Sequence, residues 1–218
     1  CYWLKVYEIP QVGKAARGKH ITNLIEQQND EKIRAFIAVK SFDENRSVVM
    51  VTRQGIIKKV NLSEFSNPRK AGIIAITIED GDDLVDAKLT DGKQEIILGT
   101  REGLALRFKE TDVREMGRTA KGVTGIRLDK KDYVIGVVAL KRDQASILVV
   151  SDQGYGKRSD VSDYRITRRG GKGIITMKAT EKTGKLIAIR EVVDNEDPVS
   201  YTHLRAHETP EHLVCRLL

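Results

Sequence analysis

Apolar and polar residues follow one another in short blocks along the chain, and one arrangement of blocks occurs three times. An apolar run, a polar pair, a glycine and a second run form VVMVTRQGIIKKV from Val48, IILGTREGLALRF from Ile96 and ILVVSDQGYGKRS from Ile147. Such runs around a tight loop are typical of β-hairpins, because the glycine supplies the positive φ that a short turn needs. The turn glycines, 48 and 51 residues apart, are Gly55, Gly103 and Gly154.

A basic, glycine-containing loop recurs in phase with these hairpins. Its copies read GKAARGKHI, NPRKAGIIAI, MGRTAKGVTGI and TRRGGKGII, and their matching glycines, 54, 50 and 51 residues apart, are Gly18, Gly72, Gly122 and Gly173. A short apolar segment follows each loop and predicts a strand. These segments are IRAFIAV from Ile33, LVDAKLT from Leu84, VIGVVAL from Val134 and LIAIREV from Leu186.

Other stretches complete the pattern of predicted elements. The connectors LSEFSNP from Leu62 and KETDVREMG from Lys109 are predicted to be turns or single helical turns. The opening segment CYWLKVYEIP places Tyr2, Trp3 and Tyr7 among apolar residues, which predicts a core strand. No segment has a long helical periodicity.

A period near 50 residues, built from several short strands, favours a propeller-like array of sheets over a solenoid. We therefore expect an all-β fold in which residues 1–198 form roughly four repeats, beginning partway through one. Residues 199–218 contain no copy of any repeated segment. We interpret them as a foreign or out-of-frame tail outside the repeat domain.

The charge balance points to an anionic partner. Among 218 residues there are 38 Lys and Arg against 31 Asp and Glu, a net charge of +7, which favours nucleic acid first and a membrane surface second. Membrane association is disfavoured because no apolar run approaches the roughly 20 residues of a spanning helix, and there is no signal-peptide pattern. The two cysteines, Cys1 and Cys215, offer neither a disulfide framework nor a metal-ligand pair. We expect a cytoplasmic protein.

The basic loops supply what phosphate binding requires, namely backbone N–H groups and cations within hydrogen-bond reach. A single charged loop is more simply a solvated connection, but four loops in register favour a binding surface. The nucleotide-binding patterns GxxxxGK[ST] and GxGxxG before a helix are absent. A row of cations along one rim would suit a duplex, whose phosphates are continuous. The candidate DNA-binding residues are Arg17, Lys19, Arg69, Lys70, Arg118, Lys121, Arg168, Arg169, Gly170, Gly171, Lys172 and Gly173.

Catalysis and metal binding have little support in the sequence. His20 has no evident partner carboxylate, and the acidic segments EDGDD from Glu79 and DNED from Asp194 lack EF-hand spacing, so they are predicted to be solvated turns. Aromatic residues make up only 5% of the chain, so we expect contacts to the DNA backbone and bending instead of base readout. The sequence predicts no catalytic residue, no metal site and no cofactor in this chain.

Longer stretches resemble the C-terminal domain of the DNA gyrase A protein. They are YWLKVYEIP…ARGKHITNLI, FSNPRKAGIIAI, RFKETDVREMGRTAKGVTGIRL and GYGKRSDVSDYRITRRGGKGII, and they cover nearly all of residues 1–198. The resemblance implies a six-bladed β-pinwheel, with roughly four blades present, whose blades exchange strands and whose basic rim wraps duplex DNA. TRRGGKG is similar to the family's glycine- and arginine-rich box, with Thr167 where the family has glutamine. Because it lies in a later blade, we interpret it as a related loop and expect the box itself before Cys1.

The resemblance also implies a setting. Gyrase A assembles with gyrase B as A2B2 in the bacterial cytoplasm, at the nucleoid, and ATP and magnesium serve the whole enzyme. The breakage–reunion region would precede Cys1 and the last blades would follow Asp197. No tyrosine here matches the family's catalytic motif, so we expect this part to bind DNA and not to cut it.

Two alternatives stay open. One is the similar pinwheel of the A-type protein of topoisomerase IV, and the other is a propeller whose basic rim binds an acidic protein. Salt dependence separates DNA from protein partners, because neutralising Z phosphates gives a log–log affinity slope of about −0.9Z.

Overall fold

The computed structural model describes residues 1–13, 16–27, 31–67, 69, 71–141 and 145–193, and their regular structure consists of β-strands and 3₁₀ turns. The strands are β1 (Ser47–Thr52), β2 (Ile56–Asn61), β3 (Leu84–Thr90), β4 (Glu95–Thr100), β5 (Leu104–Lys109), β6 (Val123–Thr124), β7 (Val134–Leu140), β8 (Ser146–Ser151), β9 (Gly156–Asp160), β10 (Ile174–Ile175) and β11 (Leu186–Val192). The 3₁₀ turns are η1 (Val6–Glu8), η2 (Ile21–Asn23), η3 (Leu62–Phe65), η4 (Glu110–Asp112) and η5 (Val161–Asp163). The prediction for residues 199–218 lies outside the described residues.

The three predicted hairpins are confirmed. β1 pairs with β2, β4 with β5 and β8 with β9, each antiparallel. The turn glycines Gly55, Gly103 and Gly154 have φ values of +82°, +89° and +79°, which are strained for residues with a side chain. The two connectors predicted to be turns contain η3 and η4.

Each hairpin gains an inner strand from its own repeat. β3 pairs with β1, β7 with β4 and β11 with β8, all antiparallel, which confirms the strands predicted from Leu84, Val134 and Leu186. The orders are β3-β1-β2-β6, β10-β5-β4-β7 and β11-β8-β9. We call these the first, second and third sheets.

The outer strand of the first and second sheets comes from the following repeat. β6 pairs with β2, with Val123 opposite Ile57, and β10 pairs with β5, with Ile174 opposite Ala105. Neighbouring sheets are therefore joined by a backbone ladder as well as by side-chain packing. This is the strand exchange that the family resemblance implied.

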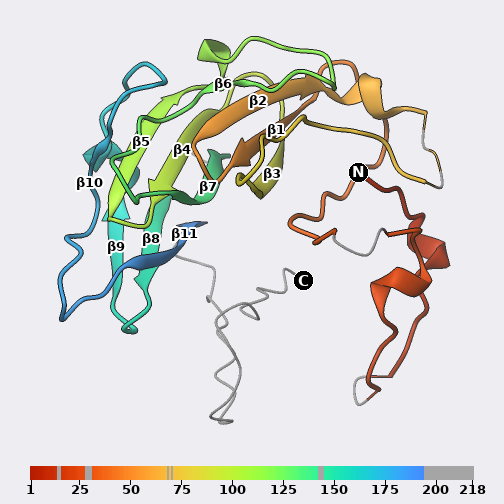
Figure 1. Ribbon diagram of the computed structural model, residues 1–218, viewed down its shortest axis with the longest axis horizontal. Helices are drawn as coiled ribbons and strands as arrows, with labels where there is room; N and C mark the ends of the chain where they lie inside the picture. Colours follow the sequence, from red (N-terminus) through yellow and green to blue (C-terminus); the bar gives the residue numbers. More distant parts are fainter. Residues whose placement is uncertain (14–15, 28–30, 68, 70, 142–144, 194–218) are drawn as a thin grey trace.

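The three sheets follow one another along an arc (Figure 1). The inner strands β3, β7 and β11 lie on its concave side, and β7 contacts both of the others. The outer strands β6 and β10 lie on its convex side. We call this convex edge the rim.

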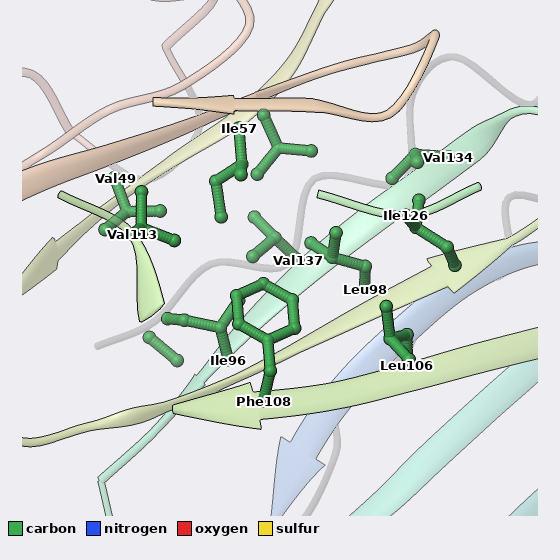
Figure 2. Close-up of a cluster of buried hydrophobic side chains, with 12 residues drawn as sticks. Val49, Ile57, Ile96, Leu98, Leu106, Phe108, Val113, Ile126, Val134 and Val137 are labelled. Carbon is green, nitrogen blue, oxygen red and sulfur yellow. The ribbon is translucent and has the colours of Figure 1, made fainter. Parts of the chain in front are cut away.

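Both faces of β1 and β4 are buried, which explains why these strands are continuous apolar runs instead of alternating ones, whereas β9 of the third sheet is mostly exposed. In β1, Val49 and Val51 face the second sheet, and Figure 2 shows Val49 opposite Ile96 and Phe108 of that sheet. The alternate residues Val48 and Met50 pack on the other side of β1.

A second core joins the second and third sheets, and a third core lies behind the first sheet. Ile97 and Val138 pack with Ile147, Val149 and Leu186 in the second core. The third core contains Val48, Met50, Val60 and Phe65. Partly buried side chains of the N-terminal segment, among them Trp3, Ile37 and Val39, pack against it.

Two predictions for the first repeat are wrong, because the described residues up to 40 form no strand. Residues 33–39 alternate between exposed and half-buried but have no ladder. In later repeats this strand pairs with one that begins 37 to 40 residues earlier, and the described residues before Ile33 provide no such partner strand. In the opening segment, Val6 and Tyr7 begin a 3₁₀ turn and are 83% and 78% exposed.

Candidate nucleic-acid interface

Two of the predicted basic loops lie along the rim. Residues 117–122 precede β6 and residues 168–173 precede β10, and we call these segments the rim loops. The amide of Met116, just before the first loop, donates to the carbonyl of Lys59 in β2 at 2.9 Å. The amide of Thr167 donates to the carbonyl of Arg107 in β5, also at 2.9 Å. Each loop is thus docked on the second strand of the preceding repeat.

The last glycine of each rim loop is required by this docking. Gly122 and Gly173 have φ of +106° and +86°. A Cβ would stand 2.7 Å from the carbonyl oxygen of Ile57 at Gly122, and 2.6 Å from that of Ala105 at Gly173. Real Cβ atoms do not approach backbone oxygen so closely, so these two positions need glycine on steric grounds.

The backbone of the second rim loop is largely engaged inside the protein. The Gly170 amide donates to the carbonyl of Gly125 at 2.6 Å, and the carbonyl of Gly171 accepts from the Arg127 amide at 2.8 Å. The amide of Gly170 is therefore not free to donate to a phosphate, contrary to the expectation from the sequence. A small pocket of about 150 Å³ opens between β5 and this loop, with Arg165 and Lys172 in its lining.

The arginines four residues before the loop glycines turn toward the preceding repeat. Arg169 donates from Nε to the carbonyl of Asp112 at 2.9 Å and from Nη1 to that of Thr124 at 3.0 Å. Nε of Arg118 lies 4.0 Å from a carboxylate oxygen of Glu64, the residue that corresponds to Asp112. These two candidates link repeats.

The lysines immediately before the loop glycines are paired with carboxylates. Nζ of Lys121 lies 2.8 Å from Glu79, and Nζ of Lys172 lies 2.8 Å from Asp129. The hydrogen bond and charge of Glu79 raise the pKa of Lys121. Both lysines keep more than half of their side-chain surface exposed, at 65% and 60%.

Arg168 is the open cation of the second rim loop. Its side chain is exposed and makes no hydrogen bond or ion pair with the residues that the structure describes. Arg69 is exposed in the loop before Ile73, and Ile73 exchanges backbone hydrogen bonds with Cys1 at 2.8 and 2.9 Å. That pairing has the same place in the repeat as Val123 with Ile57.

The other candidates are less well placed. Arg17 and Lys19 are exposed in the N-terminal segment, where the described residues form no strand that would carry them to the rim. Lys70 lies outside the described residues.

Sequence reasoning missed two exposed arginines. Arg114 and Arg165 stand eight residues before Gly122 and Gly173, and neither has a side-chain partner among the described residues. Alignment of the repeats on their glycines would have found them, because the position recurs. They extend the row of open cations along the rim.

A buried lysine lies beneath the first rim loop. Lys58 of β2 is fully buried, and its Nζ donates to the carbonyl of Ala75 at 2.9 Å and to that of Arg118. Burial, with a smaller contribution from the positive charge of Arg118, lowers the pKa of Lys58 to about 8. This ammonium group joins two successive repeats instead of facing a ligand.

Two kinds of structural feature are absent from the described residues. His, Cys, Asp and Glu side chains do not gather there in groups of three that could hold a metal ion. The same residues include no helix with the length and hydrophobicity of a membrane span.

Comparison with known families agrees with this geometry. The family model described as DNA gyrase C-terminal domain, beta-propeller, matches residues 1–40, 46–91, 94–141 and 145–192. The chain belongs to this gyrase family. The four matched segments correspond to four repeats, and the last three of them build the sheets described above.

Individual gyrase proteins are similar over most of the chain. The DNA gyrase A protein of Helicobacter pylori is 43% identical over 194 residues, which is 88% of this chain and 24% of that protein. The gyrase A protein of Salmonella typhimurium is 42% identical over 193 residues, 88% of this chain and 22% of that protein. The chain therefore spans about a quarter of the length of these type II topoisomerase proteins.

Two solved structures share the fold. A C-terminal domain of DNA topoisomerase IV matches with a TM-score of 0.79 and 29% identity, over 87% of this chain and 59% of that one. A DNA gyrase A C-terminal domain matches with a TM-score of 0.74 and 27% identity, over 82% and 59%. Fold similarity is comparable for both, while the family model and the curated relatives favour gyrase over the topoisomerase IV alternative.

Proposed function

We propose that this chain binds duplex DNA along its rim and bends it, as the DNA-wrapping part of a gyrase A protein. The observation that most supports this is the recurrence of open arginines at the outer edges of successive sheets. Arg114 and Arg165 occupy equivalent positions, Arg168 adds a third, and all three are exposed. Guanidinium groups bind phosphate through two parallel hydrogen bonds, so a row of them suits a backbone with regularly spaced phosphates.

The shape of the rim accounts for bending. A duplex that keeps contact with a convex edge must curve around it, and smooth bending of a 20 to 30 base-pair site by 40 to 90° costs about 1 to 6 kcal/mol. Counterions released from each neutralised phosphate offset that cost. The described residues include no helix that could enter a major groove, so binding should tolerate different sequences.

The wider setting belongs to the same proposal. Within A2B2 gyrase, the chain would present bent DNA to a cleavage gate elsewhere in the enzyme, so that strand passage introduces negative supercoils. Cleavage, ATP hydrolysis and magnesium binding would fall to other parts of the assembly, in the bacterial cytoplasm at the nucleoid. The chain's own contribution is mechanical.

Fluorescence anisotropy with labelled duplexes of about 30 base pairs and two unrelated sequences tests the proposal across a range of salt concentrations. The rim variant carries Arg114→Ala, Arg165→Ala and Arg168→Ala. Each lost phosphate contact should make the log–log salt slope shallower by about 0.9. Affinity should fall equally for both sequences, because phosphate contacts carry no base information.

A matched control removes three exposed cations outside the rim loops. They are Lys93 between β3 and β4, Lys141 directly after β7 and Arg190 on β11, each replaced by alanine. The proposal expects this variant to bind nearly as well as the unchanged chain. Equal losses in the two variants would mean that net charge, and not the rim, attracts DNA, and a flat salt response of the unchanged chain would favour an acidic protein partner.

A further inference from the structure

Two exposed lysine–carboxylate pairs occupy the same place in consecutive repeats. Lys121 pairs with Glu79 and Lys172 pairs with Asp129, each at 2.8 Å. Each lysine directly precedes the glycine of its rim loop. Each carboxylate stands seven residues after the loop glycine of the preceding repeat. The recurrence ties both pairs to the way in which one repeat docks on the next.

The pairs are open to solvent on both sides. The side chains of Glu79 and Asp129 are 63% and 61% exposed, close to the values of their lysine partners. Exposed ion pairs of this kind contribute little to folding stability, because water and salt screen them. We therefore expect the main effect of these ion pairs to be on the affinity for a ligand.

A DNA phosphate that approaches Lys121 or Lys172 must compete with the carboxylate already paired with that lysine. The ammonium group has three N–H donors, and at least one of them is committed to the carboxylate. The carboxylate also carries a negative charge within a few ångströms of where a phosphate oxygen would bind, which repels it. Arg168, in the same loop as Lys172, has no carboxylate partner among the described residues. The described part of the rim thus contains unpaired arginines as well as lysines that are paired with carboxylates.

We infer that Glu79 and Asp129 weaken duplex binding at the rim by competing with phosphate for Lys121 and Lys172. This inference rests on the proposed DNA binding. The two carboxylates set how tightly the duplex is held at two successive outer edges and make its release easier. They are positioning residues, since they act through the lysines.

The test is the variant Glu79→Gln with Asp129→Asn, titrated with the same labelled duplexes. Freed lysines should tighten binding about twofold to thirtyfold, which corresponds to the usual strength of two exposed ion pairs. The log–log salt slope should also steepen, because more counterions are released when the lysines are free to neutralise phosphates.

A charge-matched control breaks two lysine–carboxylate pairs that lie off the rim. Asp86→Asn frees Lys88 on β3, and Glu102→Gln in the turn between β4 and β5 frees Lys185, which directly precedes β11. A third variant repeats the Glu79 and Asp129 changes in a chain that also carries Lys121→Gln and Lys172→Gln. There the gain should vanish, because the competitor has nothing to compete for.

The inference is overturned if the rim variant binds no more tightly than the charge-matched control, or if its gain persists without the two lysines. A different result would contradict the proposed function itself, namely an unchanged affinity when Arg114, Arg165 and Arg168 are replaced by alanine. Thermal melts of all variants should coincide within a few degrees, and a large loss on breaking the rim pairs would assign them a structural role instead.

Discussion

The three hairpin glycines allow a controlled test of the docking between repeats, because their backbones match and their surroundings differ. All three have φ between +79° and +89°. A Cβ on Gly103 would overlap the carbonyl oxygen of Met177, which the following repeat brings onto the hairpin. A Cβ on Gly55 would stand 2.9 Å from the carbonyl oxygen of Ile126, and one on Gly154 would meet nothing within 4 Å.

These distances predict a graded loss of stability on substitution by alanine. The left-handed backbone costs alanine about 1 to 2 kcal/mol at each position. Overpacking against backbone adds about 1 to 3 kcal/mol where a neighbour is present. Gly103 should suffer most, because its Cβ would overlap the Met177 carbonyl oxygen outright, whereas a Cβ on Gly55 would stand 2.9 Å from the Ile126 carbonyl oxygen. The expected order of loss is Gly103, then Gly55, then Gly154.

Urea unfolding of each alanine variant, followed by circular dichroism, measures these differences. A gap of about 2 kcal/mol between the Gly103 and Gly154 variants is expected if only the former meets the neighbouring repeat. Equal losses at the three glycines would refute the reasoning, since backbone strain alone would then explain them. Unchanged m-values would confirm that the denatured state is comparable among the variants.

Three further predictions follow from polar side-chain contacts. Glu110 is fully buried and accepts a hydrogen bond from Thr90 at 2.7 Å, with Nζ of Lys59 at 3.9 Å. Glu110→Gln should therefore lower the free energy of unfolding in urea by about 3 kcal/mol. A loss below about 1 kcal/mol would contradict the pairing. Because the pKa of Lys58 is lowered to about 8 from 10.5, the unfolded chain binds more protons between these values, and stability should rise with pH across that window. Lys58→Met should lack the rise in pH-dependent melts, and a rise that survives would assign it elsewhere. Arg169→Ala should lower stability by about 2 kcal/mol through its carbonyl bonds, whereas Arg168→Ala should leave melting unchanged; equal effects would contradict their different contacts.

Local signals predicted the hairpins and inner strands correctly. Gly55 between two β-branched runs is a turn that depends on a few neighbouring residues, and Leu84 to Thr90 is apolar enough to form a strand wherever a partner exists. The segment from Ile33 is more apolar than this but forms no ladder. A strand needs a neighbour as well as a propensity, and composition alone does not supply one.

The candidate site was predicted in outline, while the state of each cation was not. The glycine spacing located the rim loops, because docking and charge recur together. Whether a cation is open depends on which residue of the preceding repeat lies opposite. Arg169 is held by carbonyl groups and Lys172 by Asp129, whereas Arg168 is open; these contacts join residues that are far apart in the sequence.

The bending of DNA around the rim is tested most directly by energy transfer between dyes at the two ends of a duplex of about 30 base pairs. Titration with the chain should bring the ends closer, and alanine at Arg114, Arg165 and Arg168 should abolish this approach at matched saturation. Saturating binding that leaves the end-to-end distance unchanged would contradict the account.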